Sequence, residues 1–151
     1  MWKKKNKKAV QPSLEVKELS IQDVRKAVHA YADNKPNKVP LSVIIKQDLT
    51  IDYDLLSPYI EGIPQKTYYM SRETYEIFEE EDFELAQEID RVQQAVDLYI
   101  QQSEDMPIID MDPYKRISFF KLERLHLLSE RPTRDFYLTD EEFMISYKKP
   151  E

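Results

Sequence analysis

The sequence contains no cysteine and only one glycine among its 151 residues. Without cysteine the chain cannot form a disulfide, a thiolate metal site or a cysteine nucleophile. Phosphate-binding loops need several closely spaced glycines, because their backbone must approach the phosphates. With Gly62 as the only glycine, nucleotide binding through a P-loop or a Rossmann fingerprint is excluded, and we expect no cofactor.

Long apolar runs are also missing. No run of about 18 or more apolar residues occurs, so we expect no segment to cross a membrane. The basic start of the chain is not followed by the apolar core of a secretory signal, which predicts a cytoplasmic protein. The lysines of this basic start are Lys3, Lys4, Lys5, Lys7 and Lys8.

Charge is distributed unevenly along the chain. The net charge is −7, and these five lysines leave 17 basic against 29 acidic side chains, or −12, on the remaining residues. A body this acidic repels phosphate backbones, so we expect no nucleic-acid partner. We expect residues 1–12 to form a disordered basic tail, whose contact with an anionic membrane surface would be at most weak.

Three apolar stretches each end at a serine or threonine that precedes an acidic or amphipathic run. A hydroxyl at such a place accepts backbone N–H groups of the first helical turn, so the pattern predicts helix N-termini. The three residues are Ser20, Ser71 and Thr139. We expect a helix over 21–33 after the first and a helix through Phe78 after the second. After Thr139, a helical turn and a hairpin with a strand at 143–147 both stay open.

Short apolar runs predict several strands. These lie at 14–16, 41–45, 67–70, 107–110 and 136–138. Residues 117–122 fit a strand or a helix, and 125–130 fit a helix. Gly62 with Pro64 behind it is typical of a left-handed helix cap, here after short turns within 50–61.

The clearest helix pattern spans residues 84–102, where apolar residues recur every three or four positions. They are Leu85, Ile89, Val92, Val96 and Tyr99. Together these elements predict a single α+β domain over residues 13–149. We expect a small mixed or mostly antiparallel sheet with the helices at 21–33 and 84–102 packed on one face.

One pair of acids suggests metal chemistry. Asp110 and Asp112 follow an apolar run, and two carboxylates at alternate positions can share a hard cation such as Mg²⁺. This favours, as an alternative function, a small metal-dependent hydrolase. However, no later lysine and aspartate pair completes such a site, and Asp112 before Pro113 is typical of an ordinary turn.

Other polar residues carry weaker signals. Asp48, Asp52 and Asp54 have the spacing of a calcium loop but lack its glycine and final glutamate, so we interpret them as turn residues. His29 and His126 have no partner spacing that indicates a metal or a catalytic base, and we expect both near the surface.

Tyrosine is abundant, with ten residues in the chain. Tyrosine is enriched in protein interfaces because it combines apolar area with one hydroxyl. We therefore predict a non-enzymatic protein-interaction or accessory module whose partner is unidentified and whose oligomeric state stays open. The candidate partner-binding residues are Tyr68, Tyr69 and Tyr137.

Three stretches, at residues 40–45, 68–78 and 135–143, resemble an uncharacterised family of small proteins from Bacillus-type bacteria. The resemblance covers roughly residues 14–149. Such a family has no assigned activity and no catalytic residues. The resemblance therefore implies a bacterial cytoplasmic setting and nothing about chemistry.

Overall fold

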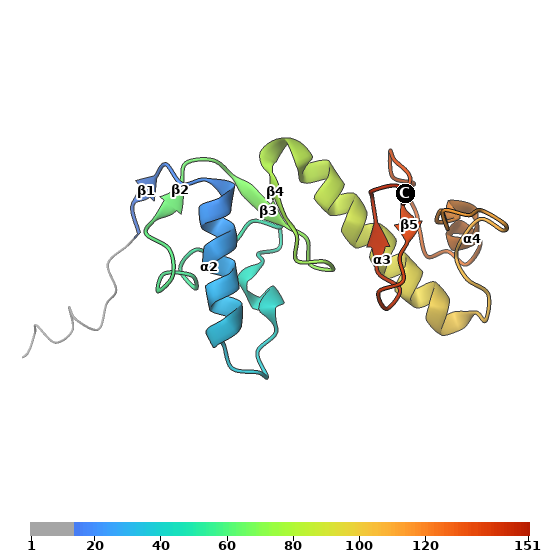
Figure 1. Cartoon of the computed structure of the whole chain (residues 1–151), viewed down its shortest axis with the longest axis horizontal. Helices are drawn as coiled ribbons and strands as arrows, with labels where there is room; N and C mark the ends of the chain where they lie inside the picture. Colours follow the sequence, from blue (N-terminus) through green and yellow to red (C-terminus); the bar gives the residue numbers. More distant parts are fainter. Residues whose placement is uncertain (1–13) are drawn as a thin grey trace, which may run out of the picture. The chain divides into compact units, whose positions relative to one another are not determined.

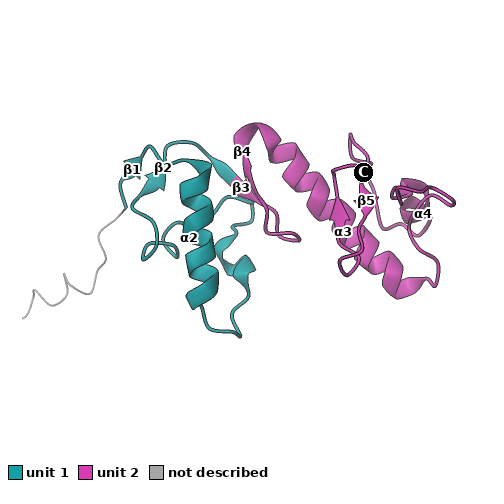
Figure 2. Cartoon of the chain, viewed as in Figure 1, with its two compact units in different colours: residues 1–68 teal, residues 69–151 magenta. Residues whose placement is uncertain are grey.

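The computed structural model describes residues 14–151 and has the α+β composition predicted from the sequence (Figure 1). The chain divides into two compact units, residues 1–68 and 69–151 (Figure 2). In the part of the chain that is described, the strands form three two-stranded sheets. The expected basic tail lies outside the described residues, and a single domain over 13–149 stays a prediction.

The first described element of unit 1 belongs to a parallel strand pair. Strand β1 (Val16–Lys17) pairs with β2 (Ile63–Pro64), so residues 16–17 lie beside residues 63–64 near the end of the unit. Gly62 precedes β2, and its φ is not left-handed, so the predicted left-handed cap is wrong. The glycine is needed instead for close backbone approach, since a Cβ there would lie 2.5 Å from the Glu15 carbonyl oxygen.

Helix α2 (Ile21–Asn34) confirms the helix predicted after Ser20. The Ser20 hydroxyl accepts the Asp23 N–H at 3.2 Å, and the Asp23 carboxylate accepts the Ser20 N–H at 2.8 Å. This reciprocal capping box satisfies two backbone donors at the helix start. One helix face is buried through Val24, Ala27 and Val28.

Residues 41–45 do not form the predicted strand. Leu41–Ile44 is instead a 3₁₀-helix, η1, which follows Pro40. The Val43 N–H donates to the Pro40 carbonyl oxygen at 3.2 Å, as in a 3₁₀ turn, and Ile44 and Ile45 are both buried. Only Ile45 pairs, through an antiparallel bridge to Ile51. The turns expected after this point are present, starting with the Leu55 N–H bonded to the Asp52 carbonyl oxygen.

Unit 2 is built on helix α3 (Phe83–Gln102), which confirms the strongest helix prediction. A 3₁₀-turn, η2 (Glu80–Asp82), precedes it within the acidic run 79–82, where repulsion between like charges disfavours one continuous helix. The other elements are β3 (Tyr68–Met70, whose first residue is the last of unit 1), β4 (Ile77–Glu79), α4 (Phe119–Arg124), β5 (Tyr137–Leu138) and β6 (Ile145–Ser146). Helix α3 contacts β4, α4 and β6.

The helix predicted after Ser71 is absent, because residues 71–76 form the turn between β3 and β4. The Ser71 hydroxyl still accepts the Thr74 N–H at 3.0 Å, as a helix cap would. The carboxylate of buried Asp90, in α3, binds the other donors of this turn. It accepts hydrogen bonds from the Ser71 hydroxyl at 2.6 Å and from the Arg72 and Glu73 N–H groups. The turn is therefore tied to α3 and does not continue as a helix.

Two further buried polar residues of α3 fix the C-terminal half of the unit. Glu88 binds Thr133 and Arg134, as described below. The Gln93 side chain accepts the Ile145 N–H at 2.9 Å and donates to the Phe143 carbonyl oxygen at 3.1 Å. These bonds hold the β5–β6 hairpin, which is antiparallel and resolves the alternatives left open after Thr139.

The segment between α3 and the hairpin has little regular structure. Residues 107–110 contribute one bridge, Ile108 to Ile117, instead of a full strand. Part of the ambiguous 117–122 segment is helical within α4. The predicted helix at 125–130 is wrong: His126, in the middle of that range, adopts a left-handed φ of 61°, which ends the helical path.

Candidate functional site

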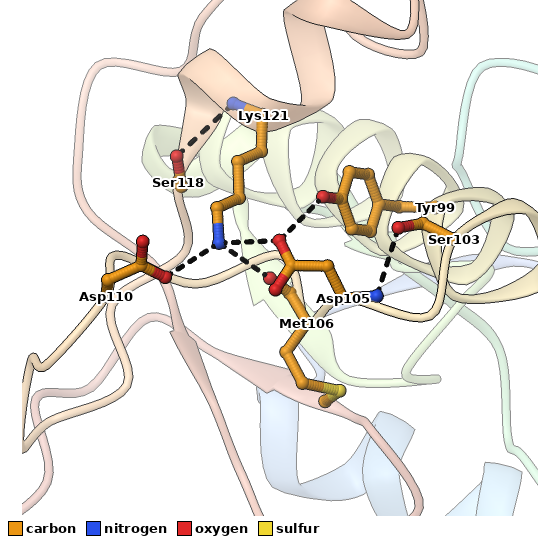
Figure 3. Close-up of polar contacts among 7 residues, drawn as sticks. All are labelled: Tyr99, Ser103, Asp105, Met106, Asp110, Ser118 and Lys121. Atoms are coloured by element: carbon orange, nitrogen blue, oxygen red, sulfur yellow. Dashed lines mark hydrogen bonds and ion pairs between the residues drawn. The ribbon is translucent and has the colours of Figure 1, made fainter.

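A charged cluster around Lys121 joins three segments of unit 2 (Figure 3). The Lys121 Nζ lies 2.8 Å from Asp105 Oδ2 and 3.0 Å from Asp110 Oδ1, and it donates to the Met106 carbonyl oxygen at 3.1 Å. An ammonium group has three donors and no acceptor. All three donors have partners, so this lysine ties α4 to the segment that follows α3.

Electrostatics favour the charged forms of Lys121 and Asp105. The hydrogen bond from Lys121 holds the pKa of Asp105 below its usual range, and the hydroxyl of Tyr99 donates to the same carboxylate at 3.1 Å. The bond to Asp105 and a weaker one to Asp110 raise the pKa of Lys121. The cluster is therefore a structural clamp.

The structure does not bring Asp110 and Asp112 to one cation. Asp110 binds Lys121, whereas Asp112 accepts the Tyr114 N–H at 2.9 Å and lies 3.7 Å from Arg116 Nε. Residues 14–151 contain no group of three or more histidine, cysteine or acidic side chains that could hold a metal ion. Through these contacts the two aspartates fix the loop 109–116.

This loop and α4 expose large apolar side chains. Met111 is 97% exposed and Phe120 is 60% exposed. Asp110 precedes Met111, and Lys121 follows Phe120. The ion pair between Asp110 and Lys121 therefore joins the two segments that carry these exposed side chains. We give the name α4 surface to the exposed large apolar residues of the loop, of α4 and of its C-cap: Ile109, Met111, Phe120 and Leu125.

The loop also contains backbone strain. Met111 has a φ of 69° and Lys115 a φ of 57°, both in the left-handed region that side chains other than glycine enter at a cost. Strained residues persist where the surrounding structure over-determines them, and they are frequent at functional sites. The Asp112 turn and the Lys121 clamp supply that surrounding structure here.

Two of the three tyrosines predicted to bind a partner are buried, and their role in binding stays a prediction. Tyr68 is 3% exposed and Tyr137 is 6% exposed. Tyr69 is half-buried, and its ring lies at 38° to that of Phe83 with ring centroids 4.3 Å apart. Sequence reasoning missed Met111 and Phe120, because neither an apolar residue between two aspartates nor the second of two adjacent phenylalanines indicates exposure by itself.

Each unit also contains a pocket. The pocket of unit 1, about 290 Å³ in volume, has Tyr68 in its lining, and the pocket of unit 2, about 440 Å³, has Tyr137. The remaining candidates behave as turn and surface residues: Asp48 accepts the Thr50 N–H at 3.0 Å, and Asp52 accepts the Asp54 N–H at 3.1 Å. His29 and His126 are exposed and belong to different units.

Comparison with known proteins places this α+β chain in one family. It belongs to a family described as proteins of unknown function (DUF3939), whose model matches residues 14–147. No curated protein and no solved structure matches the chain. The uncharacterised family inferred from the sequence is thereby confirmed, while a Bacillus-type source and a cytoplasmic location stay predictions. No helix within residues 14–151 has both the length and the apolar character needed to cross a membrane.

Proposed function

We propose that the protein is a non-enzymatic interaction module and that the α4 surface binds another protein. The observation that supports this is the exposure of Met111 and Phe120 on segments that are clamped together. Single exposed apolar residues are normal on a protein surface, but four of the eleven exposed large apolar residues among those described fall within 109–125. Burial of such a group against a partner is a common source of binding energy.

The chemistry of the surface favours a partner with an apolar docking face. Methionine adapts its shape to different surfaces, and phenylalanine offers a large rigid area. Arg124 lies over the Phe120 ring, 5.9 Å from its centroid, and gives the surface a cationic edge. The partner face would then combine an apolar centre with an acidic or polar rim.

Site-specific photo-crosslinking tests this proposal. A photoreactive side chain is placed at Met111 or at Phe120 of the full chain in cells of the source organism. We expect one discrete product of the same mass from both positions. The matched control is Val43 in unit 1, which is 47% exposed and lies outside the α4 surface, and it should give no such product.

A second variant separates binding from folding. Phe120→Ser should weaken the crosslink formed from Met111, while circular dichroism remains that of the wild type, because Phe120 buries little area in the folded chain. The proposal fails if neither position yields a discrete product, or if Val43 yields the same product.

A further inference from the structure

Methionine is the only sulfur-containing residue type in this chain, because the sequence has no cysteine. Within residues 14–151 the methionines differ in exposure. Met70 is fully buried in β3, and Met106 and Met144 are partly buried. Met111 is 97% exposed, which makes it the one methionine of this range whose side chain is open to solvent. A soluble oxidant therefore reaches the thioether of Met111 most easily.

The contacts of the loop 109–116 hold Met111 in this position. Asp110, before it, lies 3.0 Å from Lys121 Nζ, and Asp112, after it, accepts the Tyr114 N–H at 2.9 Å. With both neighbours fixed, Met111 keeps a left-handed φ of 69°, although that conformation is unfavourable for a residue with a Cβ. The exposure of the thioether is thus imposed by the ion pair and the turn on either side of it.

Oxidation of this thioether changes its polarity. With hydrogen peroxide, a sulfur lone pair attacks one peroxide oxygen, an S–O bond forms and the O–O bond breaks. The other oxygen leaves with both hydrogens as water, so the sulfur loses two electrons and the peroxide gains them. The product, methionine sulfoxide, is polar, and the change disrupts interfaces in which methionine makes apolar contacts.

We propose that Met111 is an oxidation switch of the α4 surface: hydrogen peroxide converts it to the sulfoxide, and the surface then releases its partner. This inference rests on the proposed binding function of that surface. Met111 is the most exposed residue of the α4 surface, and the phenylalanine, isoleucine and leucine beside it do not react with peroxide. Its sulfoxide would place a polar S–O group on an otherwise apolar contact. The fold is retained, because the Met111 side chain buries little area in the folded chain.

Peptide mapping by mass spectrometry tests the selectivity of the reaction. The purified full chain is treated with increasing concentrations of hydrogen peroxide and then digested. We expect Met111 to gain one oxygen before Met70, Met106 or Met144 reacts. The circular dichroism spectrum of the singly oxidised chain should remain that of the reduced chain. Earlier oxidation of any of the other three methionines would overturn the proposal.

Photo-crosslinking from Phe120 tests the effect on binding. Cells of the source organism that carry the photoreactive side chain at this position are exposed briefly to hydrogen peroxide and then irradiated. With Met111 present, the yield of the discrete product should fall on the order of tenfold, as expected when the burial of one apolar side chain is lost. In Met111→Leu, the yields with and without peroxide should be equal, because leucine has no sulfur. Met144→Leu, outside the α4 surface, is the matched control and should stay as sensitive to peroxide as the wild type.

A polar substitution tests the same step without an oxidant. Met111→Gln should lower the yield of product in untreated cells, while its circular dichroism spectrum remains that of the wild type. The switch is overturned if a product forms but its yield does not respond to peroxide, or if Met111→Leu responds as the wild type does. Both of these outcomes leave the proposed function standing. The absence of any product in untreated cells overturns the proposed function and the switch together.

Discussion

Arg134 donates from Nε to the Oε1 atom of Glu88 across 2.6 Å, and Glu88 is fully buried in α3. The other carboxylate oxygen accepts the Thr133 N–H at 2.6 Å and the Thr133 hydroxyl at 2.9 Å. A buried carboxylate is costly unless its charge and lone pairs are satisfied, and here three donors satisfy them. This contact fixes the segment before β5 on the central helix of unit 2.

Glu88→Ala should destabilise the protein by about 3 kcal/mol, because Thr133 and Arg134 lose their acceptor and a cavity opens. Arg134→Ala should cost about 2 kcal/mol, somewhat less because the arginine is partly exposed. Urea denaturation measures both values. Glu84→Ala, at an exposed position of the same helix, is the control and should change stability by less than about 0.5 kcal/mol. Equal losses at Glu84 and Glu88 would contradict the assigned role.

The three serine and threonine caps show how far local sequence determines this fold. Each hydroxyl accepts a backbone N–H two or three residues later, from Asp23, Thr74 and Glu141. Only Ser20 starts a helix. After Ser71, the donors are captured by Asp90, which lies 19 residues away in the sequence. The local pattern therefore predicts a turn, and tertiary contacts decide whether a helix follows.

The candidate site was only partly predictable for the same reason. The spacing of Asp110 and Asp112 was visible, but their partners Lys121 and Arg116 are brought close only by the fold. The spacing of apolar residues predicted α3, because all residues of its buried stripe lie within one continuous helix. The exposure of Met111 depends on how the loop 109–116 folds, and no local pattern encodes it.

Gly62→Ala should destabilise unit 1 by about 2 kcal/mol, because the added Cβ would meet the backbone oxygen of Glu15 at 2.5 Å and a carbonyl cannot easily move aside. The Ile63 N–H, which donates to that oxygen at 2.8 Å, should lose protection from hydrogen exchange. Exchange measured by NMR and a urea titration test both statements. Glu61→Ala, at the exposed preceding position, should leave this amide protected.

Met111→Gly should raise the stability of the chain by about 0.5 kcal/mol. The change relieves a left-handed φ of 69° and removes a side chain that packs against little, although glycine also increases the entropy of the unfolded state. Met111→Val should instead lower stability by about 1 kcal/mol, since branching at Cβ worsens the strain. Urea midpoints provide the comparison. A glycine variant less stable than the valine variant would show that the φ angle carries no strain.

Stability should fall at alkaline pH partly through Tyr147. Burial raises the pKa of Tyr147 to about 12, and its hydroxyl donates to Glu76 Oε2 at 2.7 Å. The folded value lies above the unfolded value of about 10. The stability that protonated Tyr147 contributes to the folded chain is therefore complete below about pH 10 and is lost as pH rises toward about 12.

The variant Tyr147→Phe tests this linkage directly. Its urea midpoint should fall less between pH 10 and about 12 than that of the wild type, because the variant lacks a tyrosine whose pKa is raised in the folded chain. The variant should still lose some stability at alkaline pH, since burial also raises the pKa of Tyr53. Ultraviolet absorbance of tyrosinate follows the titration in parallel. If wild type and variant lose stability equally over this range, Tyr147 titrates alike in the folded and unfolded chains and the linkage is wrong.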